Sequence, residues 1–153
     1  MTVDEAARDF TQIMSQIPDI IYSSMNVGAN EFNAQMQNRV FNQGKDIQGS
    51  QIGEYSPAYA EYRRSIGRQT AKVDLQLFGD LKRSVIQTRI KSGWAVKFAN
   101  QTQTNIARKN ERKFKGAENT IFDVIAQEKA DMIKVTQEEY AARVTEAFRN
   151  AGF

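Results

Sequence analysis

The sequence predicts an α+β fold: a long N-terminal helix, a small and mostly antiparallel β-sheet, and additional helices that include a C-terminal helix. Three observations lead to this prediction. Apolar residues recur every three or four positions over residues 18–42, as on one face of a helix. Apolar and polar residues alternate over residues 84–99, as in a hairpin of two strands. Helical spacing then returns over residues 102–148.

Length and composition indicate a single domain at residues 1–153. Hydrophobic residues make up 41% of the chain and charged residues 25%, which is typical of a folded soluble protein. No apolar run approaches the roughly 20 residues that a membrane-spanning helix needs, and the acidic start of the chain does not resemble a signal peptide. We divide the domain into a helical part at 1–42, a loop at 43–56, a core at 57–135 and a C-terminal helix at 136–153.

The N-terminal part begins with a capping box, in which Thr2 is followed by Glu5. We expect a short first helix over residues 3–15, an interruption at Pro18 and a longer helix from there to about residue 42. The polar face of this second helix is rich in amides, which indicates either a bias of composition or a face that packs against another subunit. These amides are Asn26, Asn30, Asn33, Gln35, Gln37 and Asn38.

Residues 43–56 contain three glycines and few apolar residues, so we expect a long loop that is mobile and contacts neighbours during assembly. Gly44 and Lys45 do not form a phosphate-binding loop, because the rest of that motif is absent. Ser56 and Pro57 then mark the start of a short helix.

Residues 73–86 change from alternating to helical spacing and back, which suits a short helical turn between extended segments. Glycine at position 79 permits a bend there. We expect residues 73–77 and 119–122 to add strands to the hairpin. The predicted core around this segment consists of Leu75, Gly79, Leu81, Trp94, Phe98 and Phe122.

Three further helices are expected after the hairpin. The first covers residues 102–113, with Ile106 and Ala107 facing inward. The second covers residues 123–134 and starts at Asp123 as its N-cap. The third starts at a second capping box, in which Thr136 is followed by Glu139, and stops near the C-terminus.

The residue types argue against catalysis. The chain has no histidine and no cysteine, so the commonest general base, the commonest metal ligand and all thiolate chemistry are missing. Asp74 and Asp80 could form a carboxylate pair, but such residues more often cap turns, and Glu111 is most simply charge balance among basic neighbours. We therefore expect no enzyme activity, no catalytic residue, no metal and no cofactor.

The net charge of +3 hides a strong pattern along the chain. Residues 51–115 hold fourteen Lys/Arg against five Asp/Glu, whereas both flanks are acidic. Such a block suits either nucleic acid or the acidic surface of a neighbouring subunit, including the flanks of another copy. No helix-turn-helix or single-strand-binding signature accompanies the charge. The candidate interface residues are Arg63, Arg64, Arg68, Lys72, Lys82 and Arg83.

Several short segments follow one another in the middle of the chain. They are Gly53-Glu54-Tyr55-Ser56-Pro57-Ala58-Tyr59-Ala60, Arg63-Arg64, Leu75 to Ile86, Trp94-Ala95-Val96-Lys97-Phe98, Ile106 to Glu111, and Ile121-Phe122. This order, over about residues 50–135, resembles the head–tail connector or tail-completion family of tailed bacteriophages, also called virion morphogenesis proteins. That family has a Ser-Pro-x-Tyr-Ala-like segment, basic residues, a Leu-x-x-Thr-Gly-x-Leu-x-x-Ser-Ile-like box and a hairpin. Phe78 stands here where threonine is usual.

The resemblance implies a structural protein of the phage neck, in a homo-oligomeric ring that joins the portal-bearing head to the tail. Its implied partners are copies of itself, neighbouring neck, portal-proximal or tail proteins and, non-specifically, the genomic DNA, but no membrane. Its implied location is the virion, and the host cytoplasm during assembly. Two alternatives stay open: a basic nucleic-acid-binding module that uses residues 51–115, and a tail-terminator or minor tail subunit.

Overall fold

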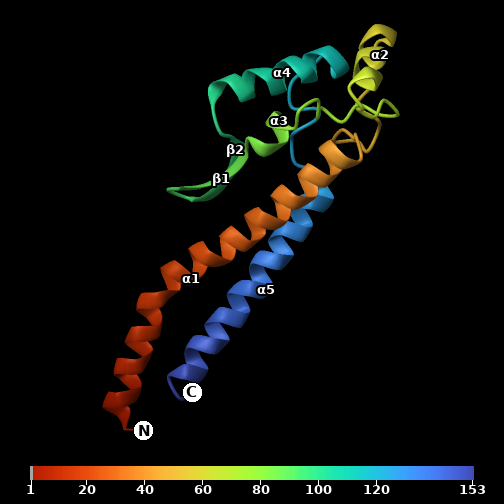
Figure 1. Cartoon of the computed structure of the whole chain (residues 1–153). Helices are drawn as coiled ribbons and strands as arrows, with labels where there is room; N and C mark the ends of the chain where they lie inside the picture. Colours follow the sequence, from red (N-terminus) through yellow and green to blue (C-terminus); the bar gives the residue numbers. More distant parts are fainter. Residues whose placement is uncertain (1) are drawn as a thin grey trace.

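The chain folds into a long helical arm joined to an α+β body (Figure 1). The computed structural model describes residues 2–153. Two antiparallel helices, α1 (Val3–Gln37) and α5 (Ala126–Asn150), form the arm, and both termini lie at its far end. The body holds α2 (Pro57–Ser65), α3 (Asp80–Arg83), β1 (Val85–Ile90), β2 (Gly93–Phe98) and α4 (Gln101–Lys115). The predicted α+β class is confirmed, with its long N-terminal helix and its C-terminal helix.

α1 begins at the predicted capping box. The Thr2 hydroxyl accepts the Glu5 N–H at 3.2 Å, and the Glu5 carboxylate accepts the Thr2 N–H at 2.6 Å. The expectation of a separate helix over residues 3–15 is wrong, because Pro18 lies inside one continuous helix. A proline removes one backbone hydrogen bond and bends a helix, and the ribbon of α1 changes direction in its N-terminal half (Figure 1). Packing on α5 along the arm keeps the two halves in one helix.

The two helices of the arm lie in close contact at Gly28. A Cβ atom placed there would lie 2.9 Å from the carbonyl oxygen of Met132 and would also collide with the hydroxyl of Thr136. One amide of the polar face contacts the neighbouring helix, since the Gln35 side chain donates to Asp131 of α5 at 3.1 Å. Glycine inside a helix is normally unfavourable, so the close approach accounts for this one.

Replacing Gly28 with alanine is expected to lower the free energy of unfolding by about 1–3 kcal/mol, because the added methyl group forces α1 and α5 apart. In an exposed helix the same change would be stabilising. Urea denaturation followed by circular dichroism measures the difference. Combining Gly28→Ala with Thr136→Ala should recover part of the loss, since the nearest colliding atom is then absent. A stabilised Gly28→Ala protein would contradict the packing described here.

The core lies where α1 enters the body. A π-helical turn, Asn38–Asn42, continues α1 and buries Val40 and Phe41. The same cluster contains Met36, Ile52, Val73, Leu81, Val85, Ala107 and Ile121. Of the predicted core residues, Leu81 is buried within it, and Leu75, Phe98 and Phe122 pack against it half-buried. Gly79 has a φ of 80°, which confirms the predicted bend.

Trp94 lies outside this cluster, and its predicted place in a common core is wrong. Its ring is half-buried on the hairpin, and its indole N–H donates to the carbonyl of Tyr22 in α1 at 2.9 Å. The turn beside it lies so close to α1 that a Cβ at Gly93 would touch the Met25 side chain at 2.6 Å. An indole with one polar edge suits this half-buried position, so Trp94 fixes the hairpin to the arm.

The sheet consists of two strands within residues 2–153. β1 and β2 pair antiparallel from Val85↔Phe98 to Ile90↔Gly93 and are joined by Lys91 and Ser92, as the alternation predicted. The expected strands at 73–77 and 119–122 are not formed. Each of these segments contains a residue with positive φ, Leu75 at 53° and Asn119 at 58°, which breaks the extended backbone of a strand.

The loop at 43–56 is irregular as predicted, but it is anchored to the body. Ile52, one of its few apolar residues, is fully buried in the core. The Asp46 carboxylate is also buried and accepts the N–H groups of Gln48 and Ser50, both at 2.9 Å, and lies 2.6 Å from the Lys115 ammonium. Burial acts to raise the pKa of Asp46, but these three partners outweigh it and hold the pKa below its ordinary value.

The last two predicted helices are one helix. α5 starts at Ala126, after Asp123, so Asp123 is not its N-cap. The Glu128 carboxylate accepts the Ile125 N–H at 3.3 Å and serves as the cap instead. Thr136 lies inside α5, where its hydroxyl donates to the carbonyl of Met132 at 2.7 Å, so the second capping box does not start a helix.

Candidate functional site

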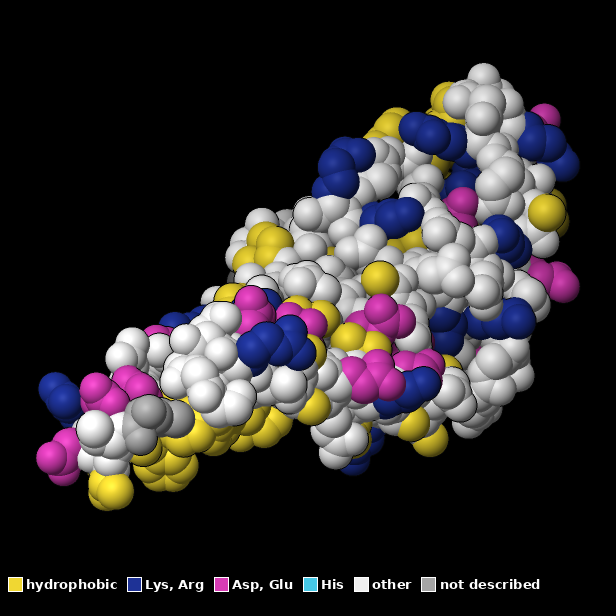
Figure 2. Space-filling view, turned by 90° about the horizontal axis from the view of Figure 1, so that it is seen from below, with side chains coloured by type: hydrophobic (Ala, Val, Ile, Leu, Met, Phe, Trp, Pro, Cys, Tyr) yellow, Lys and Arg dark blue, Asp and Glu magenta, His cyan; other side chains and the backbone are white. Residues whose placement is uncertain are grey.

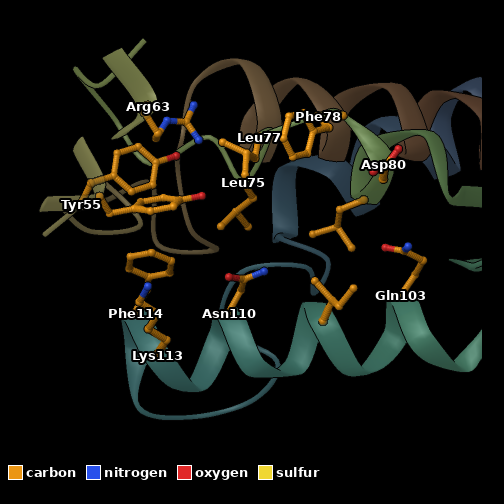
Figure 3. A pocket seen from close by; sticks show the side chains of 14 residues that line it. Tyr55, Arg63, Leu75, Leu77, Phe78, Asp80, Gln103, Asn110, Lys113 and Phe114 are labelled. Atoms are coloured by element: carbon orange, nitrogen blue, oxygen red, sulfur yellow. The ribbon is translucent and has the colours of Figure 1, made fainter. Parts of the chain in front are cut away.

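A groove on the body is the candidate site. It runs between α2, the segment 75–81 and α4 and has a volume of about 310 Å³. Figure 3 shows Tyr55, Leu75 and Phe114 around the same space as Asn110 of α4. Its mouth is apolar, since the side chains of Phe78 and Ile106 lie there and are 57% and 39% exposed. The inward direction predicted for Ile106 is therefore wrong, whereas Ala107 is buried.

Local sequence explains how the walls of this groove are placed. Pro57 occupies the first turn of α2, where a proline is tolerated. The left-handed conformation of Gly79 turns the chain into α3 and leaves Phe78 outside the core. Asn100 caps α4, because its side-chain oxygen accepts the Gln103 N–H at 2.9 Å.

A buried polar cluster lies beside the groove, and two of its residues, Tyr55 and Arg63, also line the groove. The Arg63 guanidinium donates to the Asp74 carboxylate at 3.0 and 3.3 Å, and to the carbonyl of Gln69 at 3.0 Å. The hydroxyl of Tyr55 donates to the same carboxylate at 3.0 Å, and the guanidinium lies 4.4 Å from the centre of the Tyr55 ring. Arg63 is only 1% exposed, so it was wrongly predicted as an interface residue. It holds α2 on the segment that leads to the groove.

Burial raises the pKa of Tyr55 to about 12, and the Asp74 carboxylate beside its hydroxyl acts in the same direction. The neutral phenol is therefore the form that suits the folded state. Its contribution to stability is complete below pH 10, the ordinary pKa of tyrosine, and is lost as the pH rises toward 12. Tyr55 thus remains a hydrogen-bond donor at neutral pH and does not act as a base.

The other predicted interface cations are dispersed. Arg64, Arg68 and Arg83 are exposed, and Arg83 forms an ion pair with Asp80. Lys72 and Lys82 come together at the end of α1, where both ammonium groups donate to Asn42, Lys72 to its carbonyl and Lys82 to its side chain. Asp80 and Asp74 have different cationic partners, so they are not a carboxylate pair.

α4 carries an exposed basic face that our interface prediction missed. Arg108 and Arg112 each pair with Glu118. Lys109 and Lys113 also face solvent, and among residues 2–153 no carboxylate oxygen lies within 4.0 Å of either ammonium. The Lys113 ammonium lies 5.6 Å from the centre of the Tyr59 ring, at the groove. These cations lie within the helix predicted at residues 102–113, so the sequence already contained this signal.

The arm differs from the body in charge and in exposed apolar surface. The outer part of the arm, residues 2–25 and 130–153, holds eight Asp/Glu and four Lys/Arg, whereas residues 26–129 hold ten and seventeen. Figure 2 shows hydrophobic side chains along one edge of the arm, acidic ones near its tip and basic ones over the body. The exposed large apolar residues of the arm are Val3, Phe10, Met14, Ile21, Ile133, Tyr140 and Phe153.

Metal sites, membrane spans and similar proteins were also sought. Residues 2–153 contain no group of three or more side chains suited to hold a metal ion. None of the described helices is both long enough and apolar enough to span a bilayer. No model of a known protein family matches the sequence, and neither a curated protein nor a solved structure is similar to it.

Proposed function

We propose that this chain is a structural subunit of the neck of a tailed bacteriophage, where copies of it form a ring between the portal-bearing head and the tail. The order of segments in residues 50–135 supports this proposal through its resemblance to head–tail connector proteins. The observation that carries it is the pairing, on one chain, of an acidic arm with exposed apolar residues and a basic body with a groove that is lined in part by apolar side chains.

Two different and complementary surfaces on one subunit favour head-to-tail association. Arm against arm would bring together surfaces with excess negative charge, whereas arm against body brings together opposite charges. Repeated contacts between unlike surfaces close into a ring when the rotation between neighbours permits it. An apolar patch at the centre of such a contact supplies affinity, and the charges around it supply orientation.

The experiment is a nonsense mutation in the phage gene for this chain, compared in suppressor and non-suppressor hosts. We expect the non-suppressor host to accumulate filled heads and separate tails, visible by negative-stain electron microscopy, and the suppressor host to yield complete virions. Light scattering of the purified chain should reveal a closed oligomer. Normal infectious particles that lack the protein would contradict the proposal.

The basic face of α4 favours a second candidate function, a nucleic-acid-binding module. Four cations on one helix are the kind of footprint that contacts phosphates. Such a module should bind duplex DNA as a monomer, with affinity that falls steeply as salt is added. A neck subunit should bind DNA weakly and remain associated with particles. Tails of abnormal length in the nonsense mutant would instead indicate a tail-terminator subunit.

A further inference from the structure

We infer that the N-terminal half of α1 of one copy lies in the groove between α2 and α4 of the next copy, with Met14 at the mouth of that groove. This inference rests on the proposed function, because it supposes that copies associate. It goes further by naming the segment that is bound and the surface that receives it.

The groove suits an apolar side chain delivered by a helix. Its volume of about 310 Å³ is roughly twice that of the apolar cavity of about 150 Å³ that holds a benzene molecule. Leu75 and Leu77 line it, and the exposed parts of Phe78 and Ile106 would be covered by an occupant. Covering such residues removes apolar surface from water, which stabilises the contact.

α1 presents an edge of the matching kind. Val3, Phe10 and Met14 are 86%, 50% and 52% exposed, and their spacing of seven and four residues places them on one side of the helix. Helices that bind in grooves use anchors at such intervals. The ring centre of Phe10 lies 6.5 Å from that of Phe148 in the same chain, so part of its surface is already covered. Val3 and Met14 are therefore the main free anchors.

The free carboxylates of α1 and the free ammonium groups of α4 are complementary in charge, which favours contact between this helix and this groove. Asp4 and Asp9 flank the apolar edge of α1, and no cationic group of residues 2–153 lies within 4.0 Å of their carboxylates. On α5, Glu138 pairs with Lys134 and Glu139 with Arg143, which leaves fewer free carboxylates there than on the N-terminal half of α1.

Lys113 lines the groove and Lys109 is exposed one turn before it on α4, and neither has a carboxylate partner among the described residues. Docking α1 there brings unpaired carboxylates to unpaired ammonium groups. Two arms packed against each other would instead bring four such carboxylates together, which opposes self-association of the arms.

The test uses the absence of cysteine from the chain, which lets a single thiol be introduced without background. Met14→Cys and Ile106→Cys proteins are prepared separately, mixed, and treated with a short thiol-specific crosslinker. We expect a crosslinked pair that contains one of each protein. Arg108→Cys, an exposed position on the other side of α4, replaces Ile106→Cys as the matched control and should give little product. Circular dichroism checks that each variant is folded.

The outcomes separate this inference from the proposed function. If Met14→Cys alone gives crosslinked pairs as efficiently as the mixture, the arms pack on each other and the inference is overturned. If the unmodified chain assembles on particles but no 14-to-106 product forms, the inference fails and the neck function stands. If the product forms but the nonsense mutant still yields normal virions, the contact exists and the proposed function is wrong.

A second variant measures the apolar contribution without changing charge. Met14→Gln should weaken self-association of the full chain at least tenfold, measured by light scattering over a dilution series. Ile133→Gln is the matched control, because Ile133 is a similarly exposed apolar residue of the arm on α5, and it should have little effect. Equal weakening by both variants would overturn the choice of α1.

Discussion

Replacing Glu111 with alanine should lower the free energy of unfolding by about 3–5 kcal/mol, a large share of the 5–15 kcal/mol typical of a domain. Glu111 is 4% exposed on α4. Its Oε1 atom accepts the N–H groups of Thr120, Ile121 and Phe122 at 3.0–3.2 Å, and its Oε2 atom accepts that of Asn119 at 3.1 Å. Alanine leaves these four donors without an acceptor, in a segment whose Ile121 is in the core.

Two variants separate this role from ordinary charge. Glu111→Gln keeps one oxygen, which can still accept the three N–H groups now bound by Oε1, so we expect a smaller loss than with alanine. Glu118→Ala removes a partly exposed carboxylate from its pairs with Arg108 and Arg112 and should cost under about 1 kcal/mol. Urea denaturation gives all three values. Equal losses for positions 111 and 118 would contradict the backbone-capping role.

The parts of the fold that follow from local periodicity could be predicted from the sequence. The hairpin was predictable because the large apolar residues Trp94, Val96 and Phe98 occupy every second position. α4 was predictable within two residues at each end. The predicted strand at 119–122 was wrong because its N–H groups bind the Glu111 carboxylate, which a local pattern does not reveal. The break at Pro18 was wrong because tertiary packing on α5 outweighs the loss of one helical hydrogen bond.

Buried charged residues were also difficult to predict from the sequence. Arg63 and Glu111 both stand among basic residues, and each was interpreted as a surface charge. The distinguishing signal was position on the helix: Glu111 is four residues after Ala107, on the face that α4 buries. Arg63 is likewise four residues after Tyr59. The partner of Arg63 lies in the apolar segment around Asp74, and only the folded chain brings the two together. The groove depends on the same long-range packing, so its mouth at Ile106 was not predictable.

Reversing the charge of Arg63 should destabilise the fold about as strongly as removing the Glu111 carboxylate. Arg63→Glu should lower the free energy of unfolding by at least about 3–5 kcal/mol, because it places a second carboxylate beside the buried Asp74. It also removes the hydrogen bond to Gln69 and the contact with the Tyr55 ring. Thermal unfolding followed by circular dichroism measures the loss. A folded Arg63→Glu protein with unchanged stability would show that this side chain is not enclosed.

The neighbouring residue supplies the matched control, since Arg64 is exposed and has no carboxylate within 4.0 Å among residues 2–153. Arg64→Glu should change the free energy of unfolding by under about 0.5 kcal/mol. Arg63→Lys keeps the charge but has a single nitrogen, which cannot reproduce both the donation of Nη2 to Asp74 and that of Nε to Gln69, so it should give an intermediate loss. A reversal that includes Arg63 would block incorporation into particles by unfolding the body. The test of a surface role is therefore the double variant Arg64→Glu with Arg68→Glu, which should stay folded. Reduced particle incorporation by that variant alone would assign these two arginines to a contact with a partner.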